Sequence, residues 1–520
     1  MAYAIMVQGT SSHVGKSVLC TALCRIFLQD GYRTAPFKAQ NMALNSAVTS
    51  DGGEIGRAQA AQAEAAGVKA TVHMNPILLK PKQDMHAQVI VLGSPLGDMS
   101  AREYRQDYLP RAEGVVRQSL ELLKAEFEVL VIEGAGSPAE VNLKDRDIVN
   151  MKTAELADAP VLLAADIDRG GVFASLVGTL ELLEPQEKGR VKGFIINKFR
   201  GDIDLLKPGL EFLEARTGIP VLGVVPYIHD HGIDEEDSVA LADCDRNREG
   251  EAIQIAVLQL PRISNFTDIK PLFSLPDTRV HYVKQGEKIG DADVVIIPGT
   301  KNSILDLVYL REEGYENEIL QLAGRGRQVI GICGGYQMLG QMLLDPLGTE
   351  AGTGSLPGLG LLPICTTYGS QKDTHQVKAR VCRGAGFWAQ LQGQTLHGYE
   401  IHTGQCQLPA GEGLLRIEER SGQRAEILDG MSTSDGRIWG THIHGIFDNP
   451  NLLLVFINNL RQAKGLSLLQ LNDLGVWRQE DNYDRLAAIV RDSLDMEMLY
   501  RIMNMERKQH GNDNPGSGGD

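Results

Sequence analysis

The stretch Gly331-Ile332-Cys333-Gly334-Gly335-Tyr336-Gln337 sets the architecture of the second half of this chain. An apolar pair precedes it and another follows it, which predicts a strand that turns sharply into a helix, with glycines around a single cysteine. A thiol in such a turn lies at a helix N-terminus, where unpaired N–H groups and the helix dipole lower its pKa. A lone cysteine is often a buried structural residue. The adjacent glycines favour a nucleophile here, because they let a substrate approach the backbone closely.

Residues on both sides of this turn can complete an active site. Upstream, Pro298-Gly299-Thr300-Lys301-Asn302 follows an apolar strand, and the backbone N–H groups of Gly299 and Gly334 are candidates to stabilise an oxyanion. Downstream, histidines lie in strand-like surroundings at residues 397–402 and 440–447. One of them could serve as the base for Cys333, although a single histidine is more often a satisfied core residue.

The other half of the chain begins with a phosphate-binding pattern. A buried strand at residues 4–7 leads into Gly9-Thr10-Ser11-Ser12-His13-Val14-Gly15-Lys16-Ser17, and helical periodicity follows. Glycines in such a loop let backbone N–H groups wrap phosphates, the lysine reaches the outer phosphates, and the serine holds Mg²⁺. The expected nucleotide contacts are Thr10, Gly15, Lys16 and Ser17. Five residues separate the two glycines instead of the usual four, and this longer loop resembles the dethiobiotin synthetase type, whose acceptor is a carboxylate or carbamate.

Two further strands are expected to bring polar residues to this loop. Lys38 follows the strand at residues 33–37 and is placed to pair with a phosphate or an anionic substrate, while Gln40 and Asn41 supply amide contacts; a solvated loop is the alternative. Glu133 ends a strand that begins at residue 127, and opposite Ser17 it is a natural second Mg²⁺ ligand.

Residues 142–150 are rich in charge where the chain enters a helix. Asn142, Asp145 and Asp147 either line the substrate site or belong to an exposed capping loop, and the pattern favours neither alternative. Residues 51–54 similarly place carboxylates before an Ala-rich helix, where they would act as caps.

Composition restricts the class of protein. Lysine and arginine number 51 and aspartate and glutamate 67, so the net charge is 51 − 67 = −16, without a basic block typical of nucleic-acid binding. No apolar run approaches the roughly 20 residues needed to span a membrane, and the start lacks the features of a signal peptide, so we expect a cytoplasmic protein. Seven cysteines without a C-x-x-C pair argue against a disulfide framework or a zinc site.

A chain of 520 residues is too long for one core. Strands that alternate with helices predict an α/β fold with two doubly wound domains. The expected divisions are a P-loop domain at 1–230, an acidic linker at 231–250, a second α/β domain at 251–450, a C-terminal helical segment at 451–508 and a disordered tail at 509–520.

Several stretches together resemble the cobyric acid synthase family, the glutamine-hydrolysing ligases of corrin biosynthesis. They are the P-loop at residues 8–17, Phe37-Lys38-Ala39-Gln40-Asn41-Met42, residues 133–143, Pro261-Arg262-Ile263-Ser264-Asn265-Phe266-Thr267-Asp268, and the surroundings of Cys333 and His444. The resemblance extends from about residue 3 to about residue 499. It implies a dethiobiotin synthetase-like P-loop domain followed by a class I glutamine amidotransferase-like domain.

The resemblance also implies the chemistry. Glutamine would be hydrolysed at Cys333 with His444 as base, and the ammonia would pass to the N-terminal half. There ATP, with Mg²⁺ on Ser17 and Glu133, would activate carboxylates b, d, e and g of adenosylcobyrinic acid a,c-diamide. The partners implied are this corrinoid and L-glutamine, with neither nucleic acid nor membrane.

Two positions depart from the family pattern. Many class I amidotransferases carry a glutamate two residues after the catalytic histidine, but this chain has Ile446, so a third triad member is missing or comes from elsewhere. His13 also stands in the P-loop where an acidic residue is common.

Two alternative functions follow from the same motifs. A cobyrinic acid a,c-diamide synthase contains the same two modules, but residues 37–42 and 261–268 favour cobyric acid synthase. A nucleotide switch resembling the MinD and ParA group would leave Cys333 and His444 without a role.

Overall fold

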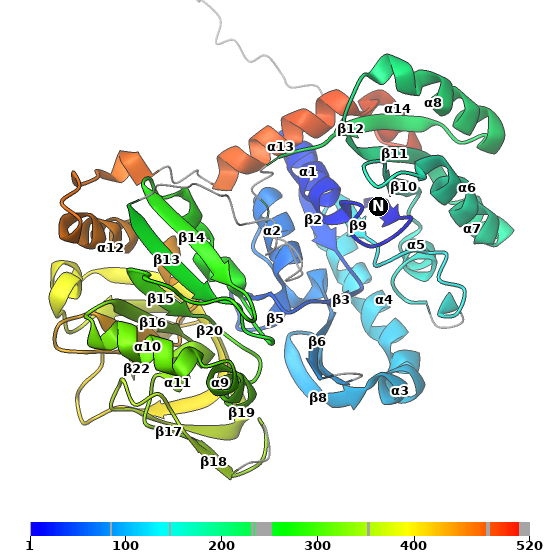
Figure 1. The fold of residues 1–520 in the computed structure, drawn as a ribbon. Coiled ribbons are helices and arrows are strands. Elements are labelled where there is room, and N and C mark those ends of the chain that lie inside the picture. The colour runs from blue at the N-terminus through cyan, green and yellow to red at the C-terminus, as the bar shows by residue number, and fades with distance from the viewer. Residues whose placement is uncertain are drawn as a thin grey trace, which may run out of the picture.

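The computed structural model describes residues 2–83, 86–144, 147–229, 233, 252–350, 354–474 and 479–508. Within these residues two α/β domains lie side by side, as the sequence predicts (Figure 1). The expected linker at 231–250, apart from Ile233, and the expected tail at 509–520 lie outside the described residues.

The first domain is built on a six-stranded sheet of order β12-β11-β10-β1-β9-β2, with all neighbouring strands parallel. Its strands are β1 (Tyr3–Gly9), β2 (Thr34–Phe37), β9 (Val129–Glu133), β10 (Val161–Asp166), β11 (Val191–Phe199) and β12 (Val221–Pro226). Because the sheet is covered on both faces, these strands are almost continuously apolar. The sheet has the doubly wound arrangement expected from the alternating pattern.

Helices cover both faces of this sheet. The face that carries Ile5 and Val7 packs on α1 (Lys16–Gln29), and the face that carries Ala4 and Met6 packs on helices from the middle of the domain. Those helices are α4 (Leu109–Glu126), α5 (Met151–Ala157), α6 (Val172–Leu182) and α8 (Ile203–Thr217); the short helices α3 (Ala101–Glu103) and α7 (Pro185–Lys188) lie between them in sequence.

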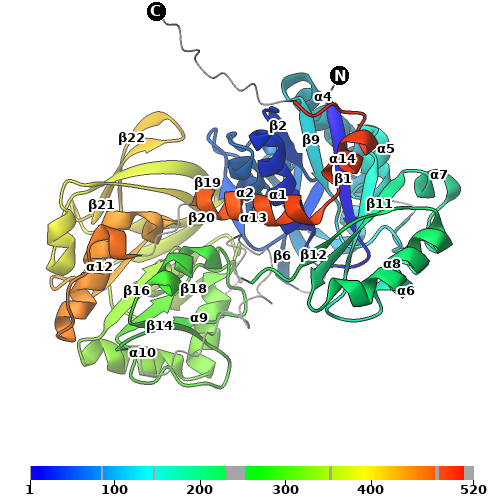
Figure 2. The same cartoon turned by 90° about the horizontal axis from the view of Figure 1, so that it is seen from above.

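The C-terminal helices return to the first domain. The helices α13 (Gln479–Ser493) and α14 (Met496–Ile502) lie against α1, whereas α12 (Pro450–Ala463) packs on the second domain (Figures 1 and 2). The side chain of Arg25 pairs with Asp484 at 2.7 Å. The helical segment expected at 451–508 is therefore divided between the two domains.

An insertion after β2 extends the first domain toward the second. It contains the sheet β3-β6-β7-β8, with β3 (Gln40–Met42), β6 (Ile77–Gln83), β7 (His86–Val91) and β8 (Ser94–Ser100). Its second part is the two-stranded β4 (Ser46–Val48) and β5 (Glu54–Gly56), followed by α2 (Arg57–Ala65). The sequence pattern suggested a loop and a longer helix here, because strands of three residues leave too short a signal.

The second domain also has a six-stranded sheet, of order β14-β13-β15-β16-β24-β23. Its strands are β13 (Ile253–Leu258), β14 (Thr278–Val283), β15 (Val294–Ile297), β16 (Gln328–Ile332), β23 (Met431–Ser432) and β24 (Ile438–Thr441). Only the pairing of β23 with β24 is antiparallel. The helices α9 (Ser303–Glu312), α10 (Tyr315–Gly324) and α11 (Gly334–Met338) follow its central strands.

A further sheet of the second domain faces the insertion. It contains β17 (Met342–Asp345), β18 (Gly354–Pro357), β19 (Cys365–Val381), β20 (Thr395–Gln407), β21 (Leu415–Arg420) and β22 (Gln423–Asp429). Val48 of β4 packs on Tyr399 and Ile401 of β20, so the two domains share an apolar contact. Among the described residues no helix is long and apolar enough to cross a membrane, and the six cysteines described are all unbonded.

Candidate active sites

The phosphate loop lies at the carboxyl end of β1, where ligands bind in open α/β sheets. Gly15 has φ 93°, a left-handed conformation that glycine adopts without strain, and it leads directly into α1. The ammonium of Lys16 bonds to the carbonyls of Ser11 and Gly136, each at 3.2 Å. Thr10 donates its N–H to Ala164 O of the neighbouring strand at 3.0 Å. These bonds hold the loop in a curved form, and the ammonium of Lys16 lies between the loop and the segment at Gly136.

Glu133 is the centre of a buried polar cluster next to this loop. Its Oε1 accepts hydrogen bonds from Ser17 Oγ and Lys38 Nζ, both at 2.9 Å, and its Oε2 accepts from Gln62 Nε2 at 2.6 Å. Burial disfavours the carboxylate, but the charge of Lys38 and these hydrogen bonds hold the pKa of Glu133 below its usual value. Glu133 is therefore an anion, as a metal ligand must be.

The cluster fits a Mg²⁺ ion of the kind found beside bound nucleotides. A hydroxyl and a carboxylate within hydrogen-bond distance supply the two hard oxygen ligands that such sites take from protein, the others being phosphate and water. Among the described residues no three His, Cys, Asp or Glu side chains are grouped to hold a metal ion alone. Ser17 and Glu133 would thus hold the ion together with the nucleotide.

Cys333 sits in the strained turn between β16 and α11. Its backbone has φ 51° and ψ −108°, an uncommon conformation for a residue with a side chain. The side chain is buried, and its thiol donates to Ile401 O at 3.6 Å. Burial disfavours the thiolate, but the charges of His444, His402 and Lys301 together hold the pKa of Cys333 below its ordinary value.

Asp268 orients His444 in this structure. Asp268 Oδ2 lies 2.7 Å from His444 Nδ1, and Asp268 Oδ1 accepts the N–H of Gly445 at 2.8 Å. Burial opposes the imidazolium, but the charges of Asp268 and Cys333 raise the pKa of His444 to about 10. Asp268 thus gives His444 a carboxylate partner from the segment at residues 261–268, and the position two residues after the histidine holds the buried Ile446.

The loop at residues 298–302 lies against both Cys333 and His444. A Cβ added to Gly299 would be 3.0 Å from His444 Cε1, and a Cβ added to Gly334 would be 2.6 Å from Thr300 Cγ2. Both glycines are needed for this close approach. The two residues predicted to form the oxyanion hole therefore lie on facing backbone segments at the thiol.

Comparison with known proteins gives the same two modules. Residues 5–241 match the family described as CobQ/CobB/MinD/ParA nucleotide binding domain, and residues 254–452 match the CobB/CobQ-like glutamine amidotransferase domain. A cobyric acid synthase from Desulforamulus reducens is 62% identical over 97% of this chain and 99% of its own. Cobyric acid synthases from Pelotomaculum thermopropionicum and Moorella thermoacetica are each 52% identical, over 100% and 98% of this chain and 99% and 98% of their own.

The chain belongs to the cobyric acid synthase family. The resemblance stated from the sequence is confirmed, and so are the two-domain α/β fold and the class of enzyme, a glutamine-hydrolysing amide ligase that uses a nucleotide. The alternatives, a diamide synthase and a nucleotide switch, are not favoured.

The amide residues proposed for substrate binding occupy different environments. Gln40 is half-buried on β3, and its Oε1 accepts the hydroxyl hydrogen of Tyr104. Asn41 is buried and donates through Nδ2 to Gln59 Oε1 at 3.0 Å, which ties β3 to α2. Asn142 is exposed, and its backbone carbonyl accepts from Arg105 at 3.0 Å. Gln40 and Asn142 thus present accessible atoms, whereas Asn41 has a packing role.

The charged loop before α5 acts as a cap in this structure. Asp147 accepts hydrogen bonds from the backbone N–H groups of Val149, Asn150 and Met151 at 2.8 to 3.0 Å. Asp145 lies outside the described residues. Of the two roles considered for this loop, substrate binding and capping, Asp147 therefore has the capping role.

His402 belongs to a second buried cluster beside the thiol. Its ring stacks on His442 with centroids 4.1 Å apart, and its Nδ1 lies 2.8 Å from Gly404 O. His442 in turn pairs with Asp429 at 2.8 Å. His402 lies 3.5 Å from Glu400, whereas His444 lies 2.7 Å from Asp268 and lowers the pKa of Cys333 more than His402 does.

A buried ionic cluster joins the two domains. Glu54 of β5 binds Lys80 of the first domain and Lys372 of the second, and Lys80 Nζ also donates to Ser46 Oγ at 2.6 Å. The charges of both lysines hold the pKa of Glu54 well below its usual value despite burial. Burial lowers the pKa of Lys301 well below its usual value, and the charges of Lys80 and Lys372 lower it further. Glu54, one of the acidic residues expected to cap α2, is thus a residue of the domain interface.

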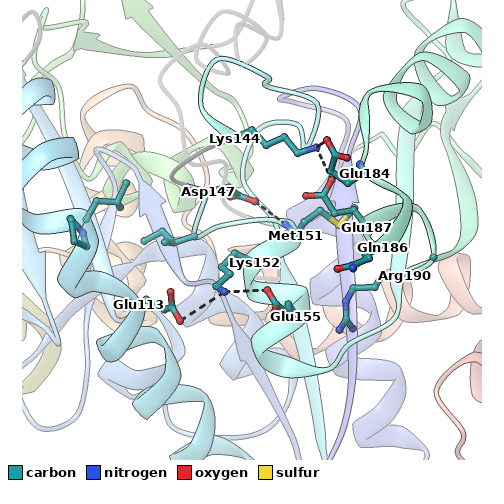
Figure 3. Close-up of a pocket in the computed structure, with 14 residues that line it drawn as sticks. Glu113, Lys144, Asp147, Met151, Lys152, Glu155, Glu184, Gln186, Glu187 and Arg190 are labelled. Carbon is teal, nitrogen blue, oxygen red and sulfur yellow. Dashed lines mark hydrogen bonds and ion pairs between the residues drawn. The ribbon is translucent and has the colours of Figure 1, made fainter.

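A cavity of about 1040 Å³ lies away from both clusters, among α4, α5 and α7 (Figure 3). Its acidic residues outnumber its basic residues five to three. Figure 3 shows that the lysines are already paired: Lys144 binds Glu184, and Lys152 binds Glu113 and Glu155. The third basic residue, Arg190, pairs with Asp158 at 3.2 Å, so each cation among the described lining residues already has an anionic partner.

Several residues of these sites were missed by sequence reasoning. Asp268 lay inside a quoted motif, but a carboxylate 176 positions from its histidine gives no spacing signal. Gln62 was read only as part of an Ala-rich helix, and Glu54 only as a cap. Each acquires its role from tertiary contacts.

Proposed function

We propose that this enzyme amidates peripheral carboxylates b, d, e and g of adenosylcobyrinic acid a,c-diamide, with ATP and glutamine, to give adenosylcobyric acid. The observation that carries the proposal is the presence, in one chain, of a Cys333–His444–Asp268 triad and a Ser17–Glu133–Lys38 cluster at a phosphate loop. The names of the relatives supply the substrate class.

In the second domain the thiolate of Cys333 attacks the side-chain carbonyl carbon of glutamine. The negative oxygen of the tetrahedral intermediate is stabilised by backbone N–H groups at Gly299 and Gly334. His444 then donates its Nε2 proton to the leaving nitrogen, ammonia departs, and a thioester remains on Cys333. Water activated by His444 hydrolyses the thioester to glutamate and restores the thiol. Asp268 holds Nδ1 protonated throughout, so that Nε2 is the atom that exchanges protons.

In the first domain a substrate carboxylate attacks the γ-phosphorus of ATP. The step breaks the bond between the γ-phosphorus and the β,γ-bridging oxygen, and it gives an acyl phosphate and ADP. Ammonia then attacks the acyl carbon and phosphate leaves, which a carboxylate oxygen could not do. Lys16 and Lys38 neutralise phosphate charge as it shifts toward the leaving group. Mg²⁺, when bound by Ser17 and Glu133, supplies further charge neutralisation.

We place the corrinoid at the carboxyl edge of the first sheet, near Gln40 and Asn142. Four carboxylates on one substrate carry negative charge, and the cavity among α4, α5 and α7 is net acidic with its lysines paired. The edge near Lys16 and Lys38 provides cations and the nucleotide together.

Mass spectrometry tests this proposal with purified enzyme, adenosylcobyrinic acid a,c-diamide, ATP, Mg²⁺ and glutamine. We expect each carboxylate of the set to gain an amide, with glutamate released for each one. A product amidated only at the a and c positions of a less processed substrate would support a diamide synthase. Nucleotide hydrolysis without any amide product would support a nucleotide switch.

A further inference from the structure

One short segment of the second domain, residues 261–268, contacts the first domain directly. The N–H of Phe266 donates to Asn45 Oδ1 at 3.2 Å, and the N–H of Ser46 donates to Asn265 Oδ1 at 3.2 Å. Both contacts are buried, and Asn265 is only 3% exposed. Asn265 has φ 52°, a conformation that asparagine tolerates better than most residues. The segment carries Asp268 three residues further on, so a domain contact lies beside the triad.

The same carboxamide touches the catalytic histidine. Asn265 Nδ2 lies 3.3 Å from His444 Nε2, and both side chains are buried. A backbone N–H can only donate, so the contact with Ser46 requires Oδ1 on that side and directs the NH₂ group at His444. An NH₂ group also only donates, so it can bond to Nε2 only while that nitrogen carries no proton. His444 Nδ1 then carries the proton toward Asp268.

This arrangement opposes the proton transfer that glutamine hydrolysis needs. To activate the thiol, the S–H bond of Cys333 breaks and a new N–H bond forms at His444 Nε2. The donor on Asn265 competes for the same lone pair. A half-turn of the carboxamide would instead place Oδ1 against Nε2, where it accepts the new N–H and stabilises the imidazolium. The charges of Asp268 and Cys333 favour the imidazolium, and the orientation of Asn265 opposes them.

A continuous path runs from Asn265 to the phosphate site. The N–H of Arg57, the first residue of α2, donates to Asn45 O at 3.4 Å. Five residues later the same helix carries Gln62, whose Nε2 donates to Glu133 Oε2 at 2.6 Å. A nucleotide and its metal ion at Glu133 compete with Gln62 for the carboxylate, so their binding acts on the helix that begins beside Asn45 and Ser46.

We propose that Asn265 is the positioning residue that couples the two active sites: while Ser46 holds its oxygen, its NH₂ group blocks His444, and ligands at the phosphate site release it. This inference rests on the proposed assignment of glutamine hydrolysis to Cys333. It predicts little glutamine hydrolysis without ATP and corrinoid. Coupling of the usual strength suppresses such hydrolysis roughly 5- to 150-fold.

Asn265→Asp tests the proposal with little change of shape. The aspartate retains an acceptor for Ser46 and tolerates the left-handed backbone, but both of its oxygens can only accept. We measure glutamate release with and without ATP, Mg²⁺ and corrinoid. We expect glutamate release without ligands to become faster than in the wild type. The ratio of the rates with and without ligands should fall to about threefold or less. An unstimulated rate at or below that of the wild type, with stimulation retained, would overturn the proposal.

A second variant uses a readout that does not depend on turnover. Asn265→Gly removes the carboxamide, and glycine adopts the left-handed conformation without strain. Alkylation of Cys333 by iodoacetamide reports the thiolate. In the wild type we expect ATP, Mg²⁺ and corrinoid to accelerate alkylation, and in Asn265→Gly we expect the faster rate without ligands. Equal slow rates in both ligand-free proteins would contradict the coupling.

Gln376→Ala is the matched control. Gln376 Nε2 donates to Val48 O at 2.5 Å, so Gln376 also links the second domain to β4. The hydrogen bond described for its side chain goes to Val48 and not to His444. We expect this variant to keep the stimulation, which separates the role of Asn265 from general domain docking. Loss of stimulation in Gln376→Ala as well would overturn the specific role. Failure of the proposed function shows separately, as glutamate release that survives Cys333→Ser.

Discussion

Replacement of Asp268 by asparagine provides a sharp test of the triad. The variant keeps the size of the side chain, and its Oδ1 can still accept the N–H of Gly445. Its Nδ2 would face His444 Nδ1, where it can only donate. The histidine would then carry its proton on Nε2, the atom that must accept the proton of Cys333. The variant therefore favours the wrong tautomer and also removes the charge that stabilises the imidazolium.

The structure gives the size of this effect. The pKa of His444 is about 10, against an ordinary value of 6.5, even though burial opposes the charge. Each unit is about 1.36 kcal/mol, so the charges and hydrogen bonds of Asp268 and Cys333 exceed the burial penalty by roughly 5 kcal/mol. If about half of that comes from Asp268, its loss costs roughly 50-fold, and the wrong tautomer adds to it. In Ser-His-Asp enzymes the same substitution costs about 10⁴. We expect glutamine hydrolysis by Asp268→Asn to fall roughly 10²- to 10⁴-fold.

Three measurements check this prediction. Glutamate release gives the rate, amidation with ammonium salt should be retained, and the pH dependence of Cys333 alkylation reports the thiolate. Because His444 holds the pKa of Cys333 below its ordinary value, the rise in alkylation with pH should move to higher pH in the variant. Glutamine hydrolysis within about threefold of the wild type, in a folded variant, would refute the role of Asp268.

Further substitutions separate the two sites and the interface. Cys333→Ser should abolish amidation from glutamine but retain amidation from ammonium salt, and equal loss with both nitrogen sources would contradict the assignment. His402→Ala should reduce glutamine-driven amidation less than His444→Ala, and the reverse order would make His402 the base. Lys16→Ala should abolish amidation with either nitrogen source; substantial amidation from ammonium would show that another lysine binds the phosphates. Glu54→Gln removes the carboxylate that binds both Lys80 and Lys372 and should lower the free energy of unfolding by about 3 to 5 kcal/mol, measured by denaturant at pH 7. Because the folded-state pKa of Glu54 lies well below its usual value, this loss should shrink as pH falls below roughly 4.3.

Local patterns predicted the parts of the sites that depend on neighbours in sequence. The loop at Lys16, the elbow at Cys333 and the strand end at Glu133 each combine an apolar strand with a defined turn, and the structure has these elements at those positions. Such features follow from backbone geometry that a few residues determine.

The parts that were missed depend on pairing between distant segments. Asp268 meets His444 only because η5 (Phe266–Ser274) lies beside the turn after β24. Glu54 looked like a cap because the two-stranded β4 and β5 are too short to show alternation. Sequence spacing carries no information on such contacts, since topology alone brings these segments together.

The interface itself indicates how the two sites communicate. Glu54, Lys80 and Lys372 are buried where the domains meet, and Glu54 binds both lysines. Separating the domains would break at once the ion pair between Glu54 and Lys372, the apolar contact of Val48 with β20, and the hydrogen bonds that join residues 45–46 to residues 265–266. Coupling between sites usually amounts to about 1 to 3 kcal/mol. Opening of the interface is therefore the more expensive route. Rotation of a single buried carboxamide, at Asn265, gives up the hydrogen bond from Ser46 and gains one from protonated His444; leaving the N–H of Ser46 unpaired costs about 1 to 3 kcal/mol, within the range of ordinary coupling energies.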